Sequence, residues 1–297
     1  MIKKEKMGML STFIGGVLWG INGTMASYLF MNKNITSNWL APYRLMSAGL
    51  LMLIFLFFKE KNKIFEVLKN KKDLFQLIFF GIFGMMGTQY TYFTTIQHSN
   101  AGIATVLQYS GINLILLYSC LKDKRFPRKF ELIALVLAIL GIFILATHGN
   151  INALKVSPIA LFWGLVSAFT LVIYSMSALS LIKKYGTALI TAWGMLIGGA
   201  VLSPFAKPWN EAGIYDNTTF TLFLLIVLFG TILSFVLYLS GVAIIGPTKG
   251  SMISCIEPVA ATLFSTVILS TPFKFLDAVG FFFILSTVFI VAYFDNK

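Results

Sequence analysis

Residues 218–244 read TTFTLFLLIVLFGTILSFVLYLSGVAI, a stretch in which no side chain carries a charge at neutral pH. Its apolar residues do not form an amphipathic stripe but fill the whole segment. A bilayer core about 30 Å thick needs roughly 20 such residues in one helix. The stretch therefore predicts a helix that crosses a membrane.

Nine further apolar runs of similar length occupy most of the remaining chain. Of 297 residues, 58% are hydrophobic and 11% are charged, and the mean hydropathy is +0.85. A soluble domain has about 25% charged residues. We therefore expect an all-α integral membrane protein with ten transmembrane helices. The predicted spans are 8–30, 37–58, 74–97, 100–121, 129–148, 156–182, 185–206, 218–244, 248–271 and 275–294.

The lysines and arginines predict how the chain is threaded. Eighteen of the 23 lie in segments on the side of the N-terminus, and only four lie in loops on the opposite side. Positive residues are retained on the cytoplasmic side, so both termini are expected in the cytoplasm, in a plasma-membrane protein. The net charge of +12 is then a topology signal and a contact for anionic lipid. No nucleic-acid partner is expected.

Ten spans divide into two sets of five, residues 1–150 and 151–297. Because each set has an odd number of spans, the second set starts from the opposite side of the membrane. Short motifs recur between the sets: Trp19-Gly20 as Trp163-Gly164, and Phe83-Gly84 with Tyr92 as Phe229-Gly230 with Tyr238. We predict two inverted five-helix repeats, an architecture common in secondary transporters.

Small residues and prolines indicate where helices approach or bend. Glycines three or four residues apart predict close helix packing, at Gly16/Gly20, Gly84/Gly87, Gly194/Gly198 and Gly246/Gly250. Pro42 and Pro258 lie inside or at the edge of spans. Each proline frees a backbone carbonyl from the helical ladder.

Two charged residues lie deep within the predicted spans, where charge is costly and usually functional. Glu257 lies about 14 Å from the cytoplasmic edge, and Arg44 about 9 Å from the outer edge, at a rise of 1.5 Å per residue. Glu257 is interpreted either as a proton- or cation-binding group or as a structural carboxyl paired with Arg44 or a backbone donor. Arg44 either binds substrate or extends to lipid headgroups.

Aromatic and amide residues supply the rest of the candidate cavity. Trp19 and Asn22 share one helix face, as do Tyr109 and Asn113, while Gln89, Tyr90 and Tyr92 populate the third span. Indole and phenol groups suit a small amphipathic solute. The predicted substrate-binding residues are Trp19, Asn22, Arg44, Tyr90, Gln108, Asn113, Trp163, Tyr174, Tyr238 and Glu257.

Several chemistries have no motif in this chain. Cys120 and Cys255 lie singly inside apolar runs, so both are expected to be free core residues rather than disulfide or metal ligands. The sequence has no GxxxxGK[ST], no HExxH and no Asp-rich magnesium pair. No cofactor and no enzymatic activity are expected. An integral-membrane enzyme acting on lipid and a channel-like facilitator remain as alternatives.

Residues 241–261, GVAIIGPTKGSMISCIEPVAA, closely resemble the signature of EamA-type permeases of the drug/metabolite transporter superfamily. Residues 99–110, SNAGIATVLQYS, and Trp19-Gly20 resemble the same family. The resemblance implies ten helices in two inverted halves and transport, often export, of amino acids or related compounds. The family's Glu-Pro pair falls on Glu257-Pro258, whereas the first half has Tyr109-Ser110 in place of a second such pair.

The combined expectation is a secondary permease for a small metabolite, most simply an amino acid or related amine. It would work by alternating access, with protons or another ion as coupling partner. For a zwitterion, Arg44 would recognise the carboxylate and Glu257 the amine.

Overall fold

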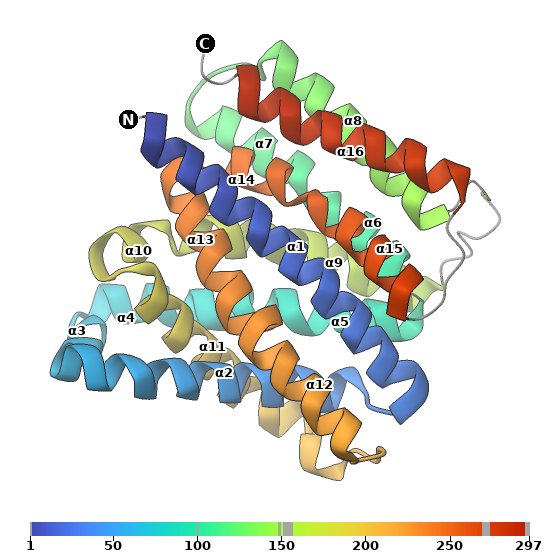
Figure 1. The fold of residues 1–297 in the computed structure, drawn as a ribbon. Coiled ribbons are helices and arrows are strands. Elements are labelled where there is room, and N and C mark those ends of the chain that lie inside the picture. Colours follow the sequence, from blue (N-terminus) through green and yellow to red (C-terminus); the bar gives the residue numbers. More distant parts are fainter. Residues whose placement is uncertain (1, 100, 148–149, 151–156, 269–273, 295–297) are drawn as a thin grey trace.

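The computed structural model describes the chain apart from residues 1, 100, 148–149, 151–156, 269–273 and 295–297. Helices cover the described residues of all ten apolar runs (Figure 1). Those of the first half are α1 (Ile2–Lys33), α2 (Ser37–Glu60), η1 (Lys61–Phe65), α3 (Glu66–Lys69), α4 (Lys71–Phe79), η2 (Phe80–Met86), α5 (Gly87–His98), α6 (Ala101–Tyr109), α7 (Gly111–Lys122) and α8 (Lys129–Thr147).

The second half also consists of long helices and of shorter helices joined into rods. Its elements are α9 (Pro158–Ser177), α10 (Leu179–Tyr185), α11 (Thr187–Ala206), η4 (Pro208–Asn210), α12 (Asn217–Val227), η5 (Leu228–Leu233), α13 (Ser234–Ile245), α14 (Pro247–Ser254), α15 (Ile256–Ile268) and α16 (Phe275–Phe294). The elements η2 and η5 are π-helical turns, and each lies within a longer helical rod. The turn η2 lies in the rod α4–α5, and η5 lies in the rod α12–α13. Each of these rods carries one copy of the repeated Phe-Gly motif.

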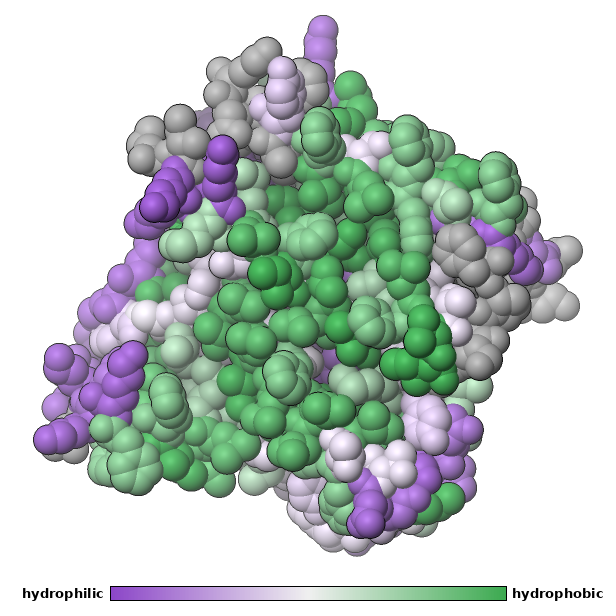
Figure 2. All heavy atoms as spheres, in the orientation of Figure 1, coloured by the Kyte–Doolittle hydropathy of each residue, from purple (hydrophilic) through white to green (hydrophobic). Residues whose placement is uncertain are grey.

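Six helices of the described chain are long and apolar enough to cross a membrane. They are Ser37–Glu60, Ile103–Lys122, Pro158–Tyr185, Thr187–Ala206, Asn217–Ile245 and Pro247–Ile268. A broad apolar band covers the face in Figure 2, and hydrophilic residues gather toward its edges. Large apolar side chains such as Phe55, Phe205 and Phe289 are exposed on the surface of the protein. So much exposed apolar surface suits lipid rather than water.

Helix starts follow from local capping chemistry. The Ser157 hydroxyl accepts the Ala160 N–H at 3.2 Å, and Pro158 occupies the first position of α9. The Asp216 carboxylate accepts the Thr219 N–H at 2.9 Å at the start of α12. These side chains satisfy backbone donors that the first helical turn leaves free.

Glycines set the closest helix contacts, as the spacing predicted. A Cβ on Gly20 of α1 would lie 2.4 Å from the Glu257 carbonyl, and one on Gly49 of α2 would lie 2.5 Å from the Leu196 nitrogen on α11. Gly246 is different, because it adopts φ +85° in the turn between α13 and α14 and contacts nothing there. The packing interpretation was wrong for Gly246, which is required for backbone conformation instead.

The two cysteines confirm their predicted role. Cys120 and Cys255 are both free and buried. Among the described residues, no three His, Cys, Asp or Glu side chains form a group that could hold a metal ion.

The contact between α1 and α15 predicts the effect of two alanine substitutions one turn apart. Gly20→Ala forces a methyl into backbone atoms of α15, and should lower stability by about 1–3 kcal/mol. Gly23→Ala is the matched control, because the nearest atom to its Cβ is the Tyr92 hydroxyl at 3.8 Å. Thermal unfolding of both purified variants in detergent measures the difference. Equal midpoints would contradict the close contact.

Candidate functional site

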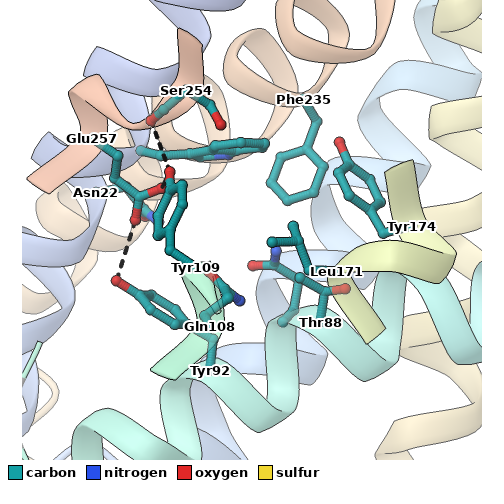
Figure 3. A pocket seen from close by; sticks show the side chains of 12 residues that line it. Asn22, Thr88, Tyr92, Gln108, Tyr109, Leu171, Tyr174, Phe235, Ser254 and Glu257 are labelled. Atoms are coloured by element: carbon teal, nitrogen blue, oxygen red, sulfur yellow. Dashed lines mark hydrogen bonds between the residues drawn. The ribbon is translucent and has the colours of Figure 1, made fainter. Parts of the chain in front are cut away.

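A small enclosed cavity lies in the middle of the helix bundle (Figure 3). Its volume is about 30 Å³, enough for about two water molecules. It is lined by Trp19, Asn22, Thr88, Gln89, Tyr92, Gln108, Tyr109, Leu171, Tyr174, Phe235, Ser254 and Glu257. These residues come from α1, α5, α6, α9, α13, α14 and α15, so both halves of the chain contribute.

Two interrupted helices meet at the cavity. The rod α6–α7 is broken at Ser110, and the rod α14–α15 is broken at Cys255. Tyr109 is the last residue of α6, and Glu257 lies in the first turn of α15. Ser110 and Cys255 both keep right-handed helical backbone angles, so each rod continues through a local irregularity beside the cavity.

Glu257 is buried, with 5% of its side chain exposed, and its carboxyl group is held by two tyrosines. The Tyr92 hydroxyl lies 3.2 Å from Oε1, and the Tyr109 hydroxyl lies 2.8 Å from Oε2. Glu257 forms no ion pair within the described chain, so the predicted alternative of a pair with Arg44 is wrong. The carboxyl is stabilised by neutral donors.

Tyr109 also contacts a carbonyl that a proline has freed. Pro258 has no N–H to donate to the carbonyl four residues earlier, which belongs to Ser254. The Tyr109 hydroxyl lies 2.7 Å from this Ser254 oxygen. The sequence prediction that Pro258 frees a carbonyl is confirmed, and the free carbonyl fixes Tyr109 beside Glu257.

Aromatic rings build the opposite wall of the cavity. The Trp19 ring centroid lies 5.1 Å from that of Phe235 and 6.4 Å from that of Tyr174. Tyr238 lies directly behind them, 4.7 Å from Trp19 and stacked on Tyr174 at 5.8 Å. Figure 3 shows Glu257 and Asn22 on one side and Phe235 and Tyr174 on the other. The cavity therefore has a polar side and an aromatic side.

Four polar atoms that line the cavity are buried and have no hydrogen-bond partner within the described chain. They are Trp19 Nε1, Asn22 Oδ1, Thr88 Oγ1 and Tyr174 Oη. Buried polar atoms are normally paired, and leaving one unpaired costs about 1–3 kcal/mol. Four such atoms around one small space indicate a site prepared for a polar guest.

The structure brings five of the predicted site residues into this cavity and separates the others. Trp19, Asn22, Gln108, Tyr174 and Glu257 line it, and Tyr238 lies one layer behind.

The remaining four predicted residues lie elsewhere. Tyr90 packs edge-on against Trp163, and its hydroxyl donates to Asn38 Oδ1 at 3.0 Å. Asn113 lines a separate cavity between α6, α7 and α8. Arg44 does not line the cavity.

Arg44 is bound to the π-helical turn η5. The side chain is fully buried, which rules out the alternative that it extends to lipid headgroups. Its Nε donates to Thr231 Oγ1 at 3.0 Å, its Nη2 lies 3.4 Å from the Gly230 carbonyl, and its guanidinium lies over the Phe93 ring. The π-turn thus finds a partner for its irregular backbone.

Sequence reasoning missed the face of α5 that lines the cavity. Thr88, Gln89 and Tyr92 contribute from this helix, whereas Tyr90 was selected. The signal was present, because polar residues at i, i+1 and i+4 share one helical face. Leu171, Phe235 and Ser254 carried no signal that separates them from ordinary core residues.

Fold and site together define a helical membrane protein that encloses a polar pocket among interrupted helices, the arrangement of a membrane transporter. The chain belongs to the EamA-like transporter family, whose model matches residues 6–147 and 158–293. It is accordingly a multi-pass membrane protein of a transporter family.

Named relatives agree with this assignment. The chain is 38% identical over 288 residues to YicL of Salmonella typhimurium, described as an uncharacterized inner membrane transporter, and the match covers 97% of this chain and 95% of YicL. It is 21% identical to the uncharacterized transporter YcbK of Bacillus subtilis, covering 94% and 93% of the two chains. A solved structure titled only as the crystal structure of a protein shares the fold, with TM-score 0.77, 16% identity and 95% coverage of both chains.

The contacts of Arg44 predict a structural rather than a substrate-binding effect. Arg44→Gln removes the hydrogen bond from Nε to Thr231 Oγ1 and the contact of the guanidinium with Phe93, and should lower the thermal midpoint by several degrees, because loss of a hydrogen bond from a charged group costs about 1.5–3 kcal/mol. The exposed Lys71→Gln is the control for loss of one positive charge. Thermal unfolding and the ratio of affinities for amino acids and their decarboxylated amines are measured together. A changed affinity ratio with an unchanged thermal midpoint would contradict the structural role and indicate that Arg44 binds substrate.

Proposed function

We propose that this protein is a secondary carrier that moves a small metabolite, an amino acid or related amine, by alternating access. The observation that carries the proposal is the enclosed pocket around Glu257, built by both halves of the chain. The pocket holds about 30 Å³, so one side of the bundle must open before a metabolite can enter. Energy would come from a solute or ion gradient.

Mirrored helix contacts support two inverted five-helix halves, residues 1–150 and 151–297. The first helix of one half packs against three helices of the other half: α1 contacts α13, α14 and α15, and α9 contacts their counterparts α5, α6 and α7. The remaining long helices pair with their own counterparts, α2 with α11 and α8 with α16 (Figure 1). An exchange of the halves would reproduce the same set of contacts, as an inverted repeat requires.

Two ion pairs follow the same symmetry. Lys33 at the end of α1 pairs with Asp216 at the start of α12, and Lys184 at the end of α10 pairs with Asp73 in α4. The hydrogen bond from Lys33 lowers the pKa of Asp216 to about 2, and the one from Lys184 lowers the pKa of Asp73. Both pairs therefore stay ionised at neutral pH, where they can hold opposite ends of the bundle.

Two glycine contacts offer the gates for alternating access. Gly20 allows α1 to pack closely against α15, and Gly164 allows α9 to pack closely against α6. A Cβ added to Gly164 would lie 2.4 Å from Leu107. With both contacts closed, the pocket has a volume of only about 30 Å³. Opening one contact at a time would expose Glu257 to one side of the membrane at a time.

A second cavity supports an access route. It has a volume of about 430 Å³ and lies near the C-terminal ends of α1 and α5. Ser27, Phe30 and Ile96 line it, one or two turns beyond the Glu257 pocket on the same helices. Opening the bundle between the two cavities would give a solute a path from that side.

The hydrogen bonds of Tyr109 support coupling to protons. Its single hydroxyl proton faces two acceptors, the Ser254 carbonyl and Glu257 Oε2. If Glu257 is protonated, its own O–H donates to Tyr109 and Tyr109 donates to Ser254, so every contact is satisfied. If Glu257 is ionised, one acceptor loses its donor. The enclosed conformation therefore favours a neutral Glu257, and the open conformations would exchange its proton.

The expected orientation places both termini in the cytoplasm. Figure 1 shows the start of α1 and the end of α16 on the same side of the bundle. The excess of lysine and arginine on that side supports a cytoplasmic assignment.

Glu257→Gln tests the function and its coupling. Glutamine keeps the size of the side chain and can donate to Tyr109, but it cannot release a proton. We expect solute counterflow in proteoliposomes to remain saturable and to lose its acceleration by a pH gradient. The exposed Glu66→Gln on α3 is the matched control and should keep that acceleration.

Two outcomes would contradict this account. A full pH-gradient response in Glu257→Gln would exclude Glu257 as the coupling group. Flux of the parent protein that never saturates would favour a channel-like facilitator over a carrier.

A further inference from the structure

We infer that the Glu257 pocket selects amines with an apolar body and rejects the corresponding amino acids. The inference rests on the proposed carrier function and narrows its substrate class. It follows from the charges of the lining, the unpaired atoms on its polar side and the aromatic wall opposite.

The lining carries one carboxyl group and no positive charge. Glu257 is its carboxyl, and none of the twelve lining residues is lysine, arginine or histidine. Once Glu257 has released its proton, an ammonium group finds a countercharge here and replaces that proton in the pocket, whereas the carboxylate of an amino acid would be buried with no countercharge. Burial of an unpaired charge is strongly unfavourable.

Arg44 is not available to supply the missing cation. Its Nε and Nη2 are directed to Thr231 and Gly230, its guanidinium covers Phe93, and the side chain is fully buried in that position. Release of Arg44 toward the pocket would break its hydrogen bond to Thr231 Oγ1 and its contact with the Phe93 ring.

The polar side of the pocket fits an ammonium group. Asn22 Oδ1 is an unpaired acceptor on a side chain that is 4% exposed, and Figure 3 shows Asn22 beside Glu257. An ammonium has three donors and no acceptor, so these two side chains offer it a carboxylate and an amide oxygen. The face of Trp19 adds an attractive surface for a cation.

The opposite side of the pocket fits an apolar body. Phe235 and Leu171 line it together with the Tyr174 ring. Figure 3 shows them across the cavity from Glu257. A molecule with an ammonium at one end and a ring or branched chain at the other would contact both sides at once.

Matched pairs of solutes test this selectivity in proteoliposomes that contain the full chain. Phenethylamine is compared with phenylalanine, and isopentylamine with leucine, as competitors of labelled phenethylamine counterflow. Each amine should compete at a concentration at least about tenfold lower than its amino acid, because the carboxylate has no partner. 3-Phenylpropionate, which has the ring and the carboxylate but no amine, should not compete.

Variants connect the selectivity to the pocket. Glu257→Gln removes the countercharge and should reduce the preference for the amine at least about tenfold, whereas the exposed Glu66→Gln should keep it. Thermal stabilisation of purified Glu257→Gln by phenethylamine and phenylalanine gives a second reading that needs no transport. Phenethylamine and phenylalanine should raise the thermal midpoint of this variant weakly and to the same extent.

The results separate this inference from the proposed function. Saturable counterflow of phenylalanine or leucine at concentrations equal to or below those of the amines would overturn amine selectivity and leave the carrier function standing. If neither class gives counterflow or thermal stabilisation, both conclusions fail.

Discussion

A carboxyl group in the middle of an apolar bundle needs hydrogen-bond donors from the protein, because lipid supplies none. Glu257 receives them from Tyr92 on α5 and Tyr109 on α6. Tyr109 lies at the irregular point of the rod α6–α7, and Pro258 frees the Ser254 carbonyl that its hydroxyl contacts. The helix breaks, the proline and the tyrosines thus form one connected arrangement around a single acid.

The same requirement explains the other buried charge. Arg44 serves the π-turn η5 and covers Phe93, so its positive charge stabilises the scaffold of the second half and is kept out of the pocket. The two ionisable groups therefore have separate tasks. Arg44 bonds Thr231 and Gly230 of η5, while Glu257 faces a cavity in which four other buried polar atoms lack partners within the described chain.

Sequence predicted the parts of this structure that follow from composition and local chemistry. The apolar runs predicted where the helices lie. Glu257 stood out as a single acidic residue within one of these runs, and it lines the candidate cavity. The inward face of α5 was marked by Thr88, Gln89 and Tyr92, but polar residues occur on several faces of this helix, so the sequence did not separate Tyr90 from Tyr92. It also could not place Arg44, because its partners are the uncharged Thr231 hydroxyl and the Gly230 carbonyl, 187 and 186 residues away, rather than an acidic side chain.

The central claim is that the Glu257 pocket opens to each side of the membrane in turn. The most direct measurement places a cysteine there by Thr88→Cys, in a chain with Cys120→Ala and Cys255→Ala, and follows its reaction with a membrane-impermeant thiol reagent. Thr88 lines the pocket and its hydroxyl has no partner in the described chain, so the change is small. Reaction from either side, in right-side-out and in inverted vesicles, is the predicted result. Reaction from one side only, or from neither, would contradict alternating access through this pocket.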